Sequence, residues 1–434
     1  MKNEKYITLL ASLVEIPSIS SIEDHREDVV KSANTVKKLF QDLGLETKIS
    51  SVASGKPAVL AKTEIDPKKK TVLLYAHHDV QPVGDEDAWQ TDPFTPEIIN
   101  GRMYGRGSGD DKAGVVLHYA VTEELLGDLP VNIKLFIEGE EEIGSPTMEE
   151  FVRENREDLD ADVIVIADSG NIRIGEPTIT TSLRGLVDAT INVKLPIFPV
   201  HSGVGGGIVP DAMMVLSKIL SSFHDSEGNL LIEGLVVDKS EVTEMDKEIL
   251  DKMLGGDKNI PYFKSPSMSE KLWLEPALDI LAINAPRVEE SVNLIIPEAS
   301  AKVSLRLAPS QDPDEAMDLL GKHVKENSPW GVDVNFIPGA KGSGVLCSSE
   351  GEFIQTLLKE FSNSWGKEPS FMGVGGSIPF ANVFSEKFPN AEIALIGVSD
   401  GELGNAHAPN ESVELEDLEK MIEALSRALI EYGK

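Results

Sequence analysis

Three short, continuous apolar runs, each followed closely by acidic or imidazole side chains, constrain the fold of this chain most strongly. They span residues 71–76, 131–137 and 163–166. An uninterrupted apolar run of this length is typical of a strand buried on both faces, as in the parallel sheet of an α/β protein. Because parallel strands point their carboxyl ends at one edge of the sheet, we expect the polar residues after the three runs to lie close together there.

The rest of the chain divides into a helix-rich part and an alternating part. Apolar residues recur at helical spacing in residues 4–16, 26–43, 112–126 and 209–222. Residues 187–193 and 301–307 instead alternate between apolar and polar side chains, which predicts half-buried strands of an antiparallel sheet. Another buried-strand pattern, at 391–396, comes shortly before His407.

Domain organisation follows from the need to bring His407 to the earlier polar segments. A chain of 434 residues exceeds what one hydrophobic core usually serves. We therefore predict a catalytic α/β domain built from residues 1–186 and 344–434. Residues 187–343 are predicted to form a second domain inserted into the first.

Composition excludes several classes of partner. Forty basic and seventy-three acidic side chains give a net charge of −33, which repels phosphate backbones and anionic membrane surfaces. Cys347 is the only cysteine, so neither an internal disulfide nor a cysteine metal cage is possible. The amino terminus lacks the pattern of a signal peptide, and no apolar run reaches the ~18 residues that span a bilayer. We expect a soluble, cytoplasmic protein that binds neither nucleic acid nor membranes.

Nitrogen and oxygen ligands suit a pair of borderline-hard divalent cations. The candidate side chains lie in five short segments and comprise His77, Asp79, Asp110, Glu141, Glu142, Asp168 and His407. Taken singly, each has an ordinary structural explanation: Asp110, for example, could simply cap the helix predicted at 112–126.

Strand geometry separates the adjacent histidines. Neighbouring side chains of a strand face opposite ways, so His77 shares a face with Asp79, whereas His78 does not. A carboxylate on that side can orient an imidazole that binds a metal, which makes His77 the better candidate ligand. The nearby glycine-rich run 105–109 lacks the spacing and the lysine of a phosphate-binding loop.

The order of these segments closely resembles that of one family, the M20 metallopeptidases, and within it the branch of carnosinase-like, cytosolic nonspecific dipeptidases. The resemblance runs through nearly the whole chain. Beyond the candidate ligands, the matching segments are Asp87-Ala88-Trp89, Thr91-Asp92-Pro93-Phe94, Tyr104-Gly105-Arg106-Gly107, His201-Ser202-Gly203-Val204 and Gly375-Gly376-Ser377-Ile378-Pro379.

The resemblance implies a fold and a cofactor. The catalytic domain is expected to be a mixed sheet flanked by helices, of the zinc-exopeptidase type. The inserted domain is expected to be a ferredoxin-like α+β lid that also forms a homodimer. Two divalent cations per subunit are implied; Zn²⁺ is favoured, and Mn²⁺ or Co²⁺ would accept the same ligands.

The resemblance also assigns roles to individual residues. His77 and Asp168 bind one metal, Glu142 and His407 bind the other, and Asp110 bridges them. Glu141 matches the general base and Asp79 the residue that supports His77. In the inserted domain, His201 matches a histidine that reaches into the partner subunit's site, and Arg306 matches an arginine that holds the substrate carboxylate. Ser377 matches a serine that contacts substrate.

One departure concerns specificity. Relatives commonly carry an arginine and an acidic residue just before the Gly-Gly-Ser-Ile-Pro motif, where this chain has Gly373 and Val374. A charge on the substrate side is therefore absent here. The substrate preference of the better-known dipeptidases need not transfer to this chain.

We therefore predict a two-metal hydrolase that cleaves dipeptides or other small peptides with a metal-bridged water and a glutamate base. An N-acyl-amino-acid deacylase or desuccinylase of the same fold is the alternative. The polar stretch 225–286 favours the dipeptidase branch, because shorter relatives lack it. A catalytically silent metal- or peptide-binding module is a third reading, which the presence of Glu141, Asp110 and His407 opposes.

Overall fold

A mixed, nine-stranded sheet organises the larger part of the molecule in the computed structural model, which describes residues 4–255, 260–376 and 379–434. Its strands run in the order β1–β2–β6–β3–β7–β18–β9–β16, with β17 paired to β9. Their bounds are β1 Glu46–Ser50, β2 Ala58–Lys62, β3 Thr71–His77, β6 Asn132–Glu138, β7 Val163–Ile166, β9 Thr178–Leu183, β16 Val345–Leu346, β17 Ser370–Val374 and β18 Glu392–Leu395. The central strands β6, β3, β7 and β18 are parallel. The three apolar runs therefore form adjacent buried strands, as predicted.

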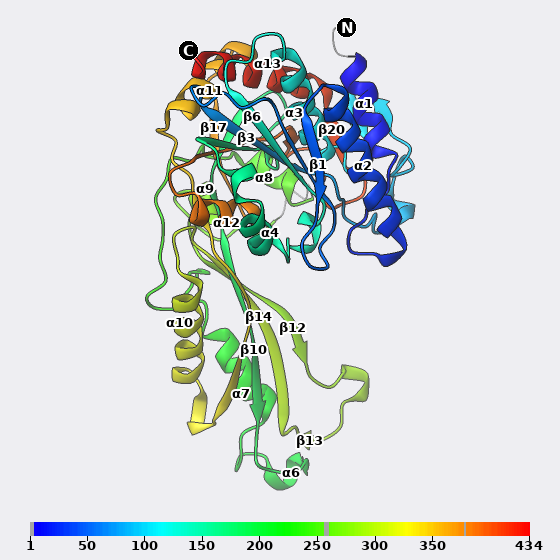
Figure 1. Ribbon diagram of the computed structural model, residues 1–434. Coiled ribbons are helices and arrows are strands. Elements are labelled where there is room, and N and C mark those ends of the chain that lie inside the picture. The colour runs from blue at the N-terminus through cyan, green and yellow to red at the C-terminus, as the bar shows by residue number, and fades with distance from the viewer. Residues whose placement is uncertain (1–3, 256–259, 377–378) are drawn as a thin grey trace.

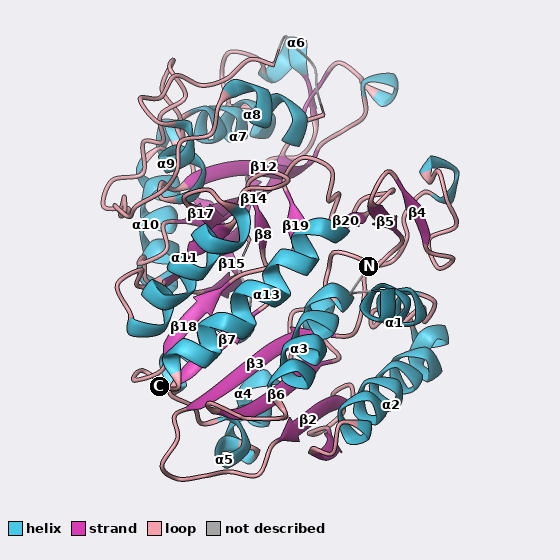
Figure 2. Ribbon diagram, turned by 90° about the horizontal axis from the view of Figure 1, so that it is seen from above, coloured by secondary structure: helices cyan, strands magenta, loops and turns pink. Residues whose placement is uncertain are grey.

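Helices cover both faces of this sheet (Figures 1 and 2). One face packs against α1 Glu4–Val14, α2 Arg26–Asp42, α3 Lys112–Leu125, α11 Glu352–Trp365 and α13 Leu415–Tyr432. The other packs against α4 Met148–Glu154, α5 Arg156–Leu159 and α12 Pro379–Lys387. Because side chains alternate along a strand, Val72 and Leu74 of β3 point into the first core and Leu73 and Tyr75 into the second. This explains why β3 is apolar at consecutive positions.

The second unit is a smaller antiparallel sheet that extends away from the first (Figure 1). Its strands run in the order β12–β14–β10–β15. Along the chain the elements are β10 Gly185–Lys194, α7 Ala212–Ser221, β12 Ala277–Asn284, β14 Glu298–Leu307, α10 Pro313–Glu326 and β15 Val334–Gly342. This β-α-β-β-α-β order is that of a ferredoxin-like unit, with α7 and α10 packed on one face of the sheet.

Residues between α7 and β12 return to the first unit before the second is complete. Helices α8 Lys247–Met253 and α9 Met268–Trp273 form a small core with Ile172 and Met372 of the larger unit. The Thr243 N–H donates to the Phe371 carbonyl oxygen at 2.7 Å, beside β17. The chain thus leaves the larger unit twice, once into β10 and again into β12. The predicted domain boundaries remain a prediction, and part of the range 187–343 packs on the larger unit.

The remaining elements are short. The strands pair as β4 Glu97–Ile99, β5 Arg102–Tyr104 and β20 Ser412–Glu414; β8 Gly170–Asn171 with β19 Ser399–Asp400; and β11 Val200–His201 with β13 Leu294–Ile295. The short helices are α6 Ser202–Gly205, η1 Glu23–His25, η2 Glu86–Ala88, η3 Glu141–Ile143, η4 Val288–Glu290 and η5 Pro329–Gly331. None of the helices in the described ranges combines the length and apolar composition needed to cross a bilayer.

Candidate metal centre

Two imidazoles and several carboxylates converge beyond the carboxyl ends of the parallel strands. His77 is the last residue of β3, Glu141 and Glu142 lie in η3 just after β6, and Asp168 follows β7. Asp110 lies before α3, and the loop between β19 and β20 contributes His407. This is the edge of an open α/β sheet at which ligands generally bind.

Asp110 lies between the two imidazoles. Its Oδ1 is 3.0 Å from His77 Nε2, and its Oδ2 is 3.0 Å from His407 Nε2. His77 Nε2 also lies 3.6 Å from Asp168 Oδ1, and His407 Nε2 lies 3.1 Å from Glu142 Oε2. One carboxylate therefore connects two clusters, each of which has one imidazole and one further carboxylate.

The Nδ1 side of His77 is held by Asp79. Nδ1 lies 3.1 Å from the Asp79 carbonyl oxygen and 3.5 Å from its Oδ1, and both side chains are fully buried. The other carboxylate oxygen of Asp79 accepts the N–H of Glu142 at 3.1 Å. This leaves His77 Nε2 directed at Asp110 and Asp168. His78 points elsewhere, with its Nε2 2.8 Å from the Pro57 carbonyl oxygen.

Ligand atoms come close enough to share a cation in two combinations. His77, Glu141 and Asp168 offer atoms within 4.8 Å of one another, as do His77, Asp110 and Glu142. All are nitrogen or oxygen donors, the set that Zn²⁺, Mn²⁺ and Co²⁺ accept. The residues present therefore fit divalent metal ions.

Electrostatics supports the same fit. Burial, with the nearby carboxylate of Asp168, raises the pKa of Glu141 to about 10. Burial and Asp110 raise the pKa of Glu142 to about 7. Hydrogen bonds to Asp110 and Glu142 raise the pKa of His407 to about 10. Buried carboxyl groups with such raised pKa values keep their protons unless a positive charge lies close to them. Divalent cations would supply that charge.

Not every predicted residue lies here. Arg306, on β14, and His201, on β11, belong to the second unit. His201 is exposed, and its Nδ1 accepts only the N–H of Gly203 among the described residues. Figure 1 places β13, the partner of β11, at the end of that unit farthest from the large sheet. Ser377 lies outside the described residues.

Two residues that frame the site were missed from the sequence. The buried Glu411 carboxylate accepts the N–H groups of Gly107, Gly109 and Asp110 through Oε1, at 3.0, 3.0 and 3.1 Å. Its Oε2 accepts Nη1 of the buried Arg106 at 2.6 Å. Burial raises the pKa of Glu411 and Arg106 opposes this, but all four contacts donate to it, so the carboxylate form fits the loop. The glycine-rich run therefore binds an anion that belongs to the chain itself.

Asp111, beside Asp110, has a separate structural role. Its carboxylate accepts the N–H of His77 at 3.1 Å and that of Gly114 at 3.2 Å, so it caps α3 and holds the end of β3. The peptide bond between Asp110 and Asp111 is cis. The capping role that sequence reasoning considered for Asp110 is thus filled by its neighbour, and the Asp110 carboxylate faces the two imidazoles.

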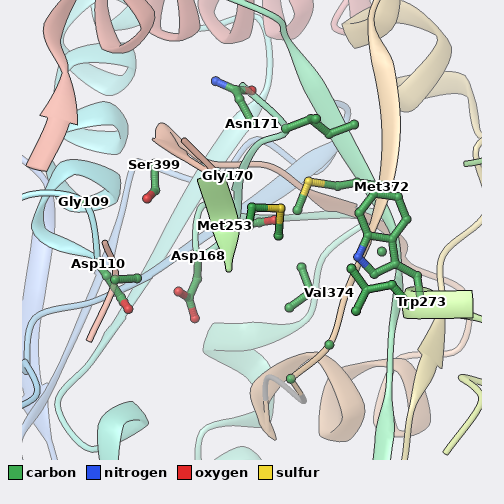
Figure 3. Close-up of a pocket in the computed structure, with 18 of the residues that line it drawn as sticks. Gly109, Asp110, Asp168, Gly170, Asn171, Met253, Trp273, Met372, Val374 and Ser399 are labelled. Atoms are coloured by element: carbon green, nitrogen blue, oxygen red, sulfur yellow. The ribbon is translucent and has the colours of Figure 1, made fainter. Parts of the chain in front are cut away.

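A cavity of about 510 Å³ opens beside the cluster (Figure 3). Asp110, Glu141, Asp168 and His407 form part of its wall. Another part is apolar and includes Trp273, Met372 and Val374. A volume of this order suits a small-molecule ligand.

Comparison with known proteins gives consistent matches. The model of "Peptidase family M20/M25/M40" matches residues 73–431. A cysteinylglycine-S-conjugate dipeptidase from Corynebacterium striatum is 30% identical over 445 residues, covering 99% of this chain and 96% of the relative. A Beta-Ala-His dipeptidase from Rattus norvegicus is 31% identical over 387 residues, covering 82% and 76%. The solved structure of an M20 family metallo-carboxypeptidase from Sulfolobus solfataricus superposes with a TM-score of 0.81 at 27% identity, covering 99% of each chain.

Proposed function

Because this chain belongs to peptidase family M20/M25/M40, as its motifs predicted, we propose that it cleaves the peptide bond of dipeptides at a pair of divalent cations. The family and its dipeptidase members make the chain a metal-dependent peptide hydrolase. We infer the dipeptide substrate, the pair of cations and the role of each residue. The observation that carries it is the position of Asp110, whose two oxygens each lie 3.0 Å from a different imidazole.

The distances around Asp110 support the residue roles that the family resemblance implies. We assign His77 and Asp168 to one cation, Glu142 and His407 to the other, and Asp110 to both. A pair of divalent cations lowers the pKa of water and polarises a carbonyl oxygen. Asp79 fixes the ring of His77 through Nδ1, so that Nε2 remains available.

Glu141 is proposed as the general base. It lines the cavity beside Asp168 and forms no hydrogen bond within the described residues that would hold its carboxylate. Its surroundings raise its pKa, so the carboxylate has a high affinity for protons. Nearby cations would lower that pKa toward the range in which one group can both accept and release a proton. Glu141 would take a proton from the attacking water and deliver it to the leaving amine nitrogen.

Arg306 is proposed to bind the terminal carboxylate of the substrate. It lies half-buried on the face of β14 opposite the helices, and its guanidinium has neither a hydrogen bond nor an ion pair among the described residues. Lys302, on the same face, is paired with Asp188 at 3.2 Å. A guanidinium without a partner suits a bidentate carboxylate.

A homodimer is proposed to complete the site. His201 lies in the second unit, away from the cluster of its own chain, so its predicted catalytic role requires another subunit. Strand β12 is an edge strand whose apolar residues Ile280, Leu281 and Ile283 are 46%, 58% and 56% exposed. An unpaired apolar edge of this kind favours pairing with another strand. A second copy of this chain is the partner we propose.

Metal removal and a substrate panel test the function. Protein stripped by chelation and reloaded with Zn²⁺, Mn²⁺ or Co²⁺ should bind two ions per subunit and hydrolyse Cys-Gly, β-Ala-His or Gly-Ala. N-acetyl and N-succinyl amino acids form the comparison panel for the deacylase alternative. Full activity in metal-free protein, or turnover of the acylated compounds alone, would contradict the proposal.

Two variants separate the base from the ligands. Glu141→Gln should lower kcat by about 10²- to 10⁴-fold, the usual contribution of a general base, while the metal content stays at the wild-type level. His407→Ala should instead reduce the metal content. Near wild-type kcat in the Glu141→Gln protein would refute the base assignment.

A further inference from the structure

A segment from the middle of the chain builds one wall of the cavity beside the metal cluster. Arg184 holds the end of this segment by donating to the carbonyl oxygens of Leu272 and Glu275, each at 2.7 Å. Arg173 pairs with Asp246 at 2.9 Å, at the start of α8. The described parts of this segment, residues 242–255 and 260–274, are therefore fixed to the larger unit, although α7 and β12 on either side of it belong to the smaller one.

The wall that this segment forms is apolar. Met245, Met253, Leu272 and Trp273 of the segment form this wall together with Ile172, Met372 and Val374 of the larger unit. Figure 3 shows Met372, Trp273 and Val374 on the side away from Asp110, with Met253 between them and Asp168. Among the described residues, the charged or imidazole side chains of the lining are those of the metal cluster alone. A substrate side chain that lies on this wall meets no fixed charge.

The backbone of β17 enforces this absence of charge. A Cβ atom added at Gly373 would lie 2.5 Å from Trp273 Cβ and 2.5 Å from Ser182 Oγ. No side chain fits there without displacing the indole of Trp273. The next residue, Val374, lines the cavity with an aliphatic group. At Gly373, one of the two positions that depart from the family pattern, Trp273 thus occupies the space that a side chain would need.

We propose that this methionine- and tryptophan-lined wall is a side-chain pocket that makes the enzyme selective for dipeptides with a bulky apolar residue. The proposal rests on the dipeptidase function argued above. An apolar side chain is transferred from water to an apolar surface, whereas a charged one loses hydration without gaining a partner. Thioether side chains are flexible and polarizable, so they adapt to aliphatic, aromatic and sulfur-containing groups of different shape.

Two substrate series test the pocket. Xaa-Gly and Gly-Xaa dipeptides, with Leu, Met or Phe as Xaa, are compared with the Gln, Glu and Lys members at saturating Zn²⁺. In at least one series kcat/KM should favour the apolar members by about tenfold or more, the discrimination that hydrophobic pockets provide. Turnover of Gly-Gly and Gly-Ala reports the dipeptidase function independently of the pocket. If these are cleaved and charged members match apolar ones in both series, the pocket proposal alone is overturned; if no dipeptide is cleaved, both proposals fail.

A charge placed in the wall provides the second test. Met253 is 44% exposed at the end of α8, so Met253→Lys introduces a cation without breaking a core. The preference for a Glu over a Leu substrate should then rise by about tenfold or more in the series that shows selectivity. Val30→Lys, at an equally exposed position (44%) on α2, is the matched control and should leave the preference unchanged. An unchanged preference in the Met253→Lys protein would overturn the assignment.

Discussion

Removing the charge of Glu411 should destabilise the loop that presents Asp110. Glu411→Gln keeps the size of the side chain but takes the anion from a contact in which both partners are 1% exposed. Arg106 would then be a buried charge without a counter-ion. Breaking a buried ion pair at one partner costs about 3 to 5 kcal/mol. Because the amide oxygen can still accept backbone N–H groups, we expect the lower end, about 3 kcal/mol.

Urea unfolding of chelator-treated protein measures this cost without any contribution from bound metal. Tryptophan fluorescence is a suitable signal, since Trp89 stacks against the Arg106 guanidinium. The matched control is Glu150→Gln, which breaks an exposed pair with Arg153 and should cost less than about 1 kcal/mol. The double variant Arg106→Met/Glu411→Gln should be more stable than Glu411→Gln alone, because it no longer buries an unpaired charge.

If Glu411→Gln were as stable as Glu150→Gln, Arg106 would have to be solvated or paired differently from the structure. In that case Glu411 would not be the anchor of the Asp110 loop. A loss of stability with unchanged metal affinity would show instead that the anchor serves folding alone.

The remaining predictions address catalysis and pH. Mixing inactive Glu141→Gln and His201→Ala subunits should restore activity, because a heterodimer contains one intact site; no recovery after proven subunit exchange would exclude action across subunits. Amidated dipeptides should be poorer substrates than free ones by one to two orders of magnitude in kcat/KM, for a lost charge-assisted contact of roughly 1.5 to 3 kcal/mol, and Arg306→Ala should remove that difference. Equal cleavage of both by the wild type would refute the anchor. Burial lowers the pKa of His118 to about 4, against 6.5 when unfolded, and its Nε2 donates to the Tyr75 carbonyl oxygen. Neutral His118 therefore contributes about 3 kcal/mol to the free energy of unfolding above pH 6.5, and this contribution is lost as the pH falls through 4. In urea unfolding, His118→Gln should flatten this loss of stability at low pH. An identical pH profile in the variant and the wild type would contradict the assignment.

Sequence reasoning succeeds here where local pattern and tertiary environment agree. The run at 71–76 is apolar at consecutive positions because both faces of β3 are covered, and its length and position follow from that alone. The opposite directions of His77 and His78 likewise follow from strand geometry. The family was predicted from the order of the motifs, and the resemblance to it implied the helices that flank the mixed sheet.

What could not be predicted depends on contacts between distant segments. Glu411 and the glycine-rich loop are separated by about 300 positions, and nothing in either local sequence indicates that one binds the other. The segment around α8 and α9 is polar and lacks a long periodic run, so its return to the larger unit carries no sequence signal. Trp273 packs over Gly373 only because that return places α9 beside β17.

The chain leaves the larger unit twice, into β10 and into β12, and this restricts how the two units can move relative to each other. Any movement of the smaller unit must bend the connections into β10 and β12 and those out of α7 and β15 together, so the smaller unit would move as one body relative to the larger one. The apolar wall belongs to the larger unit, which carries the metal ligands, whereas Arg306 belongs to the smaller unit. With Arg306 as the carboxylate anchor, the larger unit would select the side chain of the substrate, and the distance between the two units would limit the length of the peptide that can reach both Arg306 and the metal ligands.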